Sequence, residues 1–213
     1  MSRLSSIPFA ALLALVFSAS AIAAPTEADE SSATAAARVT LSATVDEVFE
    51  VLRGEGTDTD ARIAELQEIT DRRFNFSRMT KLVLGRNRKK LSKEQQLEFE
   101  QEFKRLLTVT YGGYIEKIAD EKVEIGASRL ERNGEVTVKT KIVGSSVDNL
   151  LVDYRMREND GTWAIIDVII EGISLVQNYR TQVQEIVSAE GPERLIVVLR
   201  EKNNDAEDEA GSD

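Results

Sequence analysis

The chain has 213 residues with 27 Lys or Arg, 37 Asp or Glu, and no His or Cys, so its net charge is −10. The missing residue types exclude disulfides, zinc sites built on thiolate or imidazole, His-ligated haem, and Ser-His-Asp or Cys-His catalysis. The acidic balance argues against nucleic acid as a partner, because phosphates require a positive surface.

The first 23 residues have the pattern of a secretory signal peptide. Arg3 supplies a positive region, residues 7–17 form an apolar run, and Ala21-Ile22-Ala23 matches the small-residue cleavage pattern. The apolar run is too short for a membrane span, which needs about 20 residues. We therefore expect export, cleavage before Ala24, and a mature chain that is free in solution.

Helical spacing dominates the next part of the chain. Residues 24–37 are small and polar, and we expect a flexible linker there. Apolar residues then recur at spacings of three and four, which predicts an amphipathic helix that ends at Gly54. Shorter helices are expected around residues 63–69 and from Ser77, as N-cap, to Gly85.

The longest predicted helix begins at a capping box, Ser92-Lys93-Glu94-Gln95. Its apolar side extends from Phe99 to Ile118. Gly112-Gly113 interrupts the pattern, so we expect a bend or a division of the helix there. An apolar side of this kind more often packs in a core than it binds a ligand.

Between Lys122 and Glu171 the apolar period changes to two, which predicts strands. Three turn signals separate four such strands: Asn133-Gly134, Gly144-Ser145-Ser146 and Asn159-Asp160-Gly161. The fourth strand, residues 163–170, is apolar on both sides apart from Asp167. We therefore expect both of its faces to be covered, or to face something apolar.

Helical spacing returns after Ser174, a candidate N-cap, and Pro192 suits the first turn of a final helix. Residues 201–213 contain six acidic residues and one basic residue, which predicts a disordered acidic tail. The order of helices, antiparallel strands and helices indicates an α+β fold in one domain over residues 38–200.

Several segments together resemble the MlaC, or toluene-tolerance, family: Phe74-Asn75-Phe76-Ser77, Val83-Leu84-Gly85-Arg86, the capping box with the aromatic residues after it, and Asp167 to Arg180. The likeness rests on their order and spacing behind a signal peptide. The resemblance implies a curved, NTF2-like, four-stranded antiparallel meander flanked by N-terminal and C-terminal helices. It also implies a periplasmic carrier that shields phospholipid acyl chains.

The resemblance implies partners as well. Family members exchange lipid with an outer-membrane lipoprotein complex and with an inner-membrane ABC transporter that bears an MCE-domain subunit. The implied protein is a monomer that docks transiently on these membrane proteins and maintains the lipid asymmetry of the outer membrane. It needs no cofactor, no metal and no catalytic residue.

The expected pocket lies between the apolar face of the sheet and the helices. Its predicted lipid-binding residues are Phe103, Leu107, Tyr111, Val138, Ile142, Val152, Tyr154, Ile166, Val168, Ile173 and Val176. The predicted headgroup or docking residues are the basic run Arg86, Arg88, Lys89 and Lys90. Ordinary core packing and a solvated loop are the simpler explanations of these two sets.

Two other functions stay open at this point. Asp167 is a carboxylate within an apolar strand, so it could be the general base of an NTF2-like isomerase or hydrolase. The structural alternative is that Asp167 bonds a backbone N–H group or pairs with an Arg. The third hypothesis is a periplasmic chaperone or adaptor whose apolar groove binds a protein.

Overall fold

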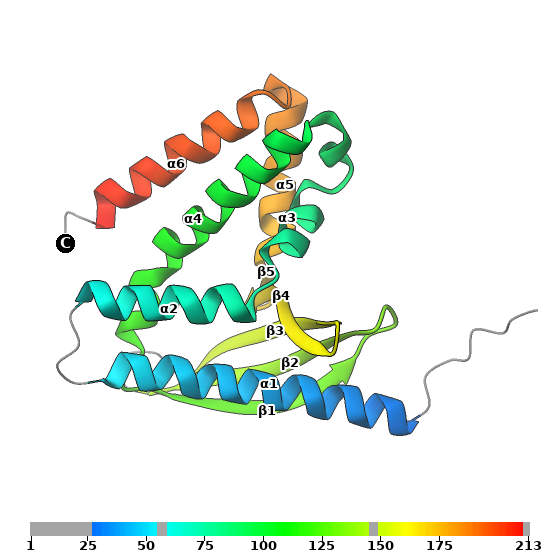
Figure 1. Cartoon of the computed structure of the whole chain (residues 1–213), viewed down its shortest axis with the longest axis vertical. Helices are drawn as coiled ribbons and strands as arrows, with labels where there is room; N and C mark the ends of the chain where they lie inside the picture. The colour runs from blue at the N-terminus through cyan, green and yellow to red at the C-terminus, as the bar shows by residue number, and fades with distance from the viewer. Residues whose placement is uncertain (1–26, 55–58, 145–148, 211–213) are drawn as a thin grey trace, which may run out of the picture.

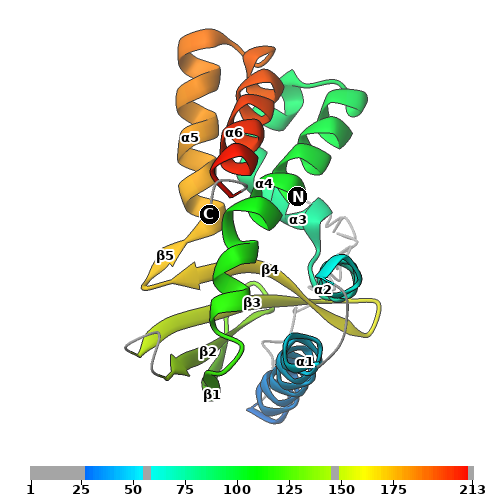
Figure 2. The same ribbon diagram turned by 90° about the vertical axis from the view of Figure 1, so that its left-hand side faces the viewer.

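The computed structural model describes residues 27–54, 59–144 and 149–210, so the expected signal peptide lies outside the described residues. The elements in chain order are α1 (Glu27–Arg53), α2 (Thr59–Arg73), α3 (Phe76–Leu84), the 3-10 helix η1 (Gly85–Lys90), α4 (Lys93–Lys117), β1 (Lys122–Leu130), β2 (Glu135–Val143), β3 (Leu150–Asn159), β4 (Thr162–Ile170), β5 (Ile173–Ser174), α5 (Leu175–Glu190) and α6 (Arg194–Ala210). Helix α1 lies along the sheet, and α3 to α6 stand above its β4 edge (Figures 1 and 2).

The predicted antiparallel meander is confirmed, with strand order β1-β2-β3-β4 and the two-residue β5 added beside the end of β4. Between β3 and β4, Asp160 and Gly161 both have positive φ, at 49° and 80°. That is the backbone of a two-residue primed turn, which matches the right-handed twist of the strands it joins. The pairing register shifts once between β1 and β2 and once between β3 and β4, and such bulges bend strands. The result is the expected curved sheet.

Helix α1 covers part of one sheet face. Its Ala37 and Leu41 are buried in a cluster with Val136 and Val138 of β2 and Met156 of β3. Because α1 begins at Glu27, the flexible linker expected over residues 24–37 is wrong from residue 27 onward. The segment is rich in Ala, the best helix former, and the small Ala37 side chain fits against the sheet.

The helices above the sheet share a second core. Met79 and Val83 of α3, Phe99 and Phe103 of α4, and Val183 of α5 are all buried in it. The capping box is confirmed. The N–H of Gln95 donates to Ser92 Oγ at 3.2 Å, and the N–H of Ser92 donates to Gln95 Oε1 at 2.8 Å. Helix α3 is capped by Asn75 rather than by Ser77, since the Asn75 side chain accepts the N–H of Arg78 at 2.9 Å.

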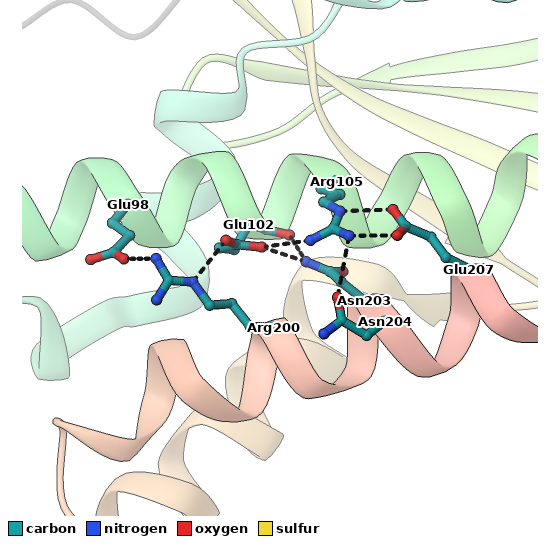
Figure 3. A network of polar contacts seen from close by, with 7 residues as sticks. All are labelled: Glu98, Glu102, Arg105, Arg200, Asn203, Asn204 and Glu207. Atoms are coloured by element: carbon teal, nitrogen blue, oxygen red, sulfur yellow. Dashed lines mark hydrogen bonds and ion pairs between the residues drawn. The ribbon is translucent and has the colours of Figure 1, made fainter.

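Helix α6 extends to Ala210, so the disordered tail expected over residues 201–213 is wrong for residues 201–210. Side chains of α4 and α6 form a polar network: Glu98, Glu102, Arg105, Arg200, Asn203, Asn204 and Glu207 (Figure 3). The fully buried Asn203 donates to Glu102 Oε2 at 2.7 Å. Arg105 donates to both carboxylate oxygens of Glu207, and this contact lowers the pKa of Glu207. Two of the acidic residues that predicted disorder are therefore partners for arginines: Glu207 pairs with Arg105 and Glu201 with Arg194.

Helix α4 is continuous through Gly112-Gly113, which the sequence had indicated as a bend or division. A Cβ atom added at either glycine would meet no heavy atom within 4 Å. We expect Gly112→Ala and Gly113→Ala each to raise the free energy of unfolding by about 0.5–1 kcal/mol, because glycine costs that much backbone entropy inside a helix. Urea unfolding of both variants measures the change.

The matched control for these variants is Gly85→Ala. Gly85 has a φ of +52°, and a Cβ there would lie 3.2 Å from Arg180 Nε. The control is expected to lose stability, because alanine rarely adopts this backbone conformation. A loss of stability at positions 112 and 113 would contradict the open space seen around them.

Candidate functional site

An apolar cavity of about 660 Å³ lies between the C-terminal half of α4 and one face of the sheet. The residues that line it are Phe74, Phe76, Met79, Leu107, Tyr111, Tyr114, Ile115, Ile118, Ile142, Leu150, Val152, Tyr154, Val168, Ile170 and Leu175. Among these described lining residues none carries a charge, and the polar side chains are the three tyrosines. A volume of this size is ordinary for a ligand pocket, which holds about 300–1,000 Å³.

The sheet wall of the cavity follows from strand alternation. Ile142, Val152 and Tyr154 point to the same face as Val136 and Val138. Helix α1 packs on the part of this face that contains Val136 and Val138. The rest of the face stays uncovered by α1 and becomes the cavity wall.

The helical wall is held in place at both ends. At the C-terminal end of α4, Arg53 of α1 donates to the carbonyl oxygens of Ala119 and Glu121, at 2.9 and 3.1 Å. These bonds fix the residues that follow α4. The N-terminal half of α4 is held by α6 through the polar network of Figure 3. The segment between the two anchors, residues 107–118, passes in front of the sheet (Figure 2) and supplies the helical side of the cavity.

A third wall comes from the segment between α2 and α3. The N–H of Asn75 donates to the Ile165 carbonyl of β4 at 2.9 Å, so this segment is tied to the sheet. The rings of Phe74 and Phe76 on either side of Asn75 stack with their centroids 5.8 Å apart. Both rings border the cavity.

The structure brings six of the predicted pocket residues to the cavity: Leu107, Tyr111, Ile142, Val152, Tyr154 and Val168. Their contact with a lipid stays a prediction. The other five lie elsewhere. Phe103 and Val176 are in the helical core, Val138 is under α1, Ile166 is fully buried in β4, and Ile173 is 61% exposed.

Ile166 does not line the cavity because the pairing of β3 with β4 is irregular at this residue. Arg155 pairs with Asp167, but the next residue of β3, Met156, pairs with Ile165, so Ile166 is an extra residue in β4. A bulge of this kind breaks the alternation of side chains along β4, so a position in the middle of this strand, on which the prediction for Ile166 rested, does not place it at the cavity. Leu150 and Ile170 were missed although they continue the alternation of Val152 and Val168. Phe74 and Phe76 carried no sequence signal for a cavity.

The basic run is remote from the cavity. Arg86, Arg88, Lys89 and Lys90 are exposed on η1, at the end of α3 that points away from the sheet (Figure 1). None of the four lines the cavity. The geometry therefore gives no support to a headgroup role for them, and a docking role stays a prediction.

Asp167 is fully buried and does not line the cavity. Ser174 Oγ donates to its Oδ2 at 2.6 Å, and the N–H of Val176 donates to its Oδ1 at 3.1 Å. The Arg155 guanidinium lies 3.5 Å from the same Oδ2 atom. The structural alternative, a backbone bond together with an Arg partner, is confirmed: Asp167 joins β4 to the first turn of α5.

A second depression in the described structure differs in character. It measures about 840 Å³, and its lining includes the charged residues Arg129, Glu131, Lys139 and Asp153. Within residues 27–54, 59–144 and 149–210, no group of three or more acidic side chains is arranged to hold a metal ion. In the same residues, no helix has the length and apolarity needed to cross a membrane.

Comparison with known proteins identifies relatives in sequence and in fold. Residues 42–201 match the sequence model of the family described as MlaC protein. The toluene tolerance protein ttg2D of Pseudomonas putida is 23% identical over 103 residues, and the match spans 48% of each chain, about half the length of that relative. A solved structure of a phospholipid-binding protein from Ralstonia solanacearum, in complex with a phospholipid, has a TM-score of 0.71 and 26% identity. The match covers 80% of this chain and 98% of the chain in that structure.

Proposed function

The chain belongs to the MlaC protein family, and we propose that it is a phospholipid carrier that shelters acyl chains in the cavity between α4 and the sheet. The observation that carries the proposal is the lining of the cavity, which is apolar and free of charge among its described residues. The phospholipid in the related protein from Ralstonia solanacearum supports the choice of ligand.

The energetics suit a carrier. Removing a methylene from water is worth about 0.8 kcal/mol, so an acyl chain of about 15 carbons gains roughly 12 kcal/mol in the cavity. A bilayer offers the chain nearly the same gain, so transfer between the two is close to isoenergetic. The charged phosphate cannot enter an uncharged cavity cheaply, so it stays in water. The cavity therefore recognises the chains rather than the headgroup.

The proposal extends to the place of action and the partners. The pattern of residues 1–23 supports removal of a signal peptide and export to the periplasm. There a monomer would shuttle lipid between an outer-membrane lipoprotein complex and an inner-membrane ABC transporter with an MCE-domain subunit, and so maintain outer-membrane asymmetry. We propose no catalytic residue, and the position of Asp167 outside the cavity supports that choice.

The direct test is to extract the purified protein with organic solvent and to analyse the extract by mass spectrometry. We expect diacyl phospholipid in amounts comparable to the protein, because the cavity would otherwise expose its apolar wall to water. Protein that carries only polar ligands, or none, after expression in a lipid-rich host would contradict the proposal. A polypeptide bound in place of lipid would favour the chaperone hypothesis.

A further inference from the structure

Tyr154 is the tyrosine of the cavity whose hydroxyl has no hydrogen-bond partner among the described residues. The hydroxyls of Tyr111 and Tyr179 lie close enough to affect each other's pKa, and Tyr114 is 67% exposed. Tyr154 lies in the middle of the sheet, between Val138 of β2 and Val168 of β4. Its neighbours across both strands therefore provide neither a donor nor an acceptor.

Whether the Tyr154 hydroxyl finds a hydrogen-bond acceptor depends on what fills the cavity. Burial raises the pKa of Tyr154 to about 12, so the group keeps its proton and remains a donor at physiological pH. Water in an empty cavity can accept this hydrogen bond. Acyl chains that displace the water cannot accept it, and a buried donor left unpaired weakens binding. A ligand that brings its own acceptor avoids that loss.

We infer that the Tyr154 hydroxyl donates a hydrogen bond to an ester carbonyl oxygen of the lipid held in the cavity. This inference rests on the proposed function. The phosphate is charged and the hydrocarbon has no acceptor, so the ester carbonyl is the neutral acceptor that can enter with the chains. The cavity then distinguishes ester-linked lipids from ether-linked ones, because an ether linkage has no carbonyl group.

The test is a competition between two lipids that differ in this group alone. Delipidated wild-type protein and Tyr154→Phe are offered an equimolar mixture of a diacyl phosphatidylglycerol and its dialkyl ether analogue. Native mass spectrometry then gives the ratio of the two lipids bound. We expect wild type to prefer the ester lipid about threefold to tenfold, the worth of one net hydrogen bond, and Tyr154→Phe to bind both about equally.

Tyr179→Phe is the matched control, because Tyr179 is a tyrosine whose pKa is also raised by burial but which does not line the cavity. It is expected to keep the wild-type ratio of ester to ether lipid. The empty Tyr154→Phe protein should melt no lower than empty wild type, since no hydrogen bond within the protein is lost.

Two results would overturn the inference while leaving the proposed function intact. One is wild-type protein that loads both lipids equally, and the other is an ester preference that survives in Tyr154→Phe. A lower melting temperature of the empty variant would also overturn it, because the hydroxyl would then serve the fold. Wild-type protein that loads neither lipid would overturn the proposed function together with this inference.

Discussion

Val152→Glu protein is expected to remain folded and to lose at least about nine-tenths of its bound lipid. Val152 lines the cavity from the first half of β3, next to about 660 Å³ of space. A carboxylate there must either lose its hydration, which costs several kcal/mol, or keep water in the cavity and exclude the acyl chains. Both routes weaken lipid binding. Because the cavity can admit water, we expect the free energy of unfolding to fall by less than about 2 kcal/mol.

The matched control is Ile166→Glu, which introduces the same carboxylate on the neighbouring strand β4. Ile166 is fully buried and does not border the cavity, so no water can reach the new carboxylate. We expect this variant to lose more than about 4 kcal/mol and to be largely unfolded. Melting by circular dichroism and lipid per protein separate the two outcomes. Unfolding at both positions would make Val152 an ordinary core residue, and folded Val152→Glu with full lipid would place the ligand elsewhere.

The sheet was predictable because its signals are local. Alternation of apolar residues and turns such as Asn159-Asp160-Gly161 depend on residues that are adjacent in the sequence. The caps at Ser92 and Ser174 are local in the same sense, since each bonds a backbone N–H three residues later. Pattern and structure therefore agree for these elements.

The errors in the sequence interpretation involve partners that are distant in the chain. The acidic segment after Arg200 predicted disorder because the partner of Glu207 lies on α4. Glu207 bonds Arg105, which is 102 residues away. The Ala-rich start of α1 looked like a linker, but Ala37 packs on β2 and β3. Both contacts join residues that are far apart in the sequence, so a local sequence pattern does not reveal them.

The cavity itself was predictable only in part. Alternation places Val138 and Val152 on one face, but it cannot tell which of them a helix will cover. That outcome depends on where α1 lies across the sheet and how far α4 stands from it. Val138 is accordingly buried with Ala37 and Leu41, whereas Val152 borders the cavity. The bulge that moves Ile166 off the pattern is likewise a property of strand pairing rather than of sequence period.

Asp167→Ala is expected to lower the free energy of unfolding by about 2–4 kcal/mol, because it removes the acceptor of two hydrogen bonds in the interior. Three groups lose their partner at once: Ser174 Oγ, the N–H of Val176 and the Arg155 guanidinium. Asp167→Asn keeps an acceptor for Val176 but not the charge, so we expect a loss of about 1–3 kcal/mol. Urea unfolding measures both variants.

Ser174→Ala measures how much the capping of α5 contributes to stability, apart from the contribution of Asp167. Ser174 Oγ accepts the N–H of Gln177 and donates to Asp167, whereas the bond from Val176 to Asp167 does not involve it. The loss of the Ser174 hydroxyl is therefore expected to cost about 1 kcal/mol of stability, as for other N-cap residues, and less than Asp167→Ala.

Because Asp167 does not line the cavity, the fraction of Asp167→Asn that folds should carry as much lipid as wild type. Unchanged stability of Asp167→Ala, or stable Asp167→Asn that has lost its lipid, would show that this carboxylate serves the ligand and not the joint between β4 and α5.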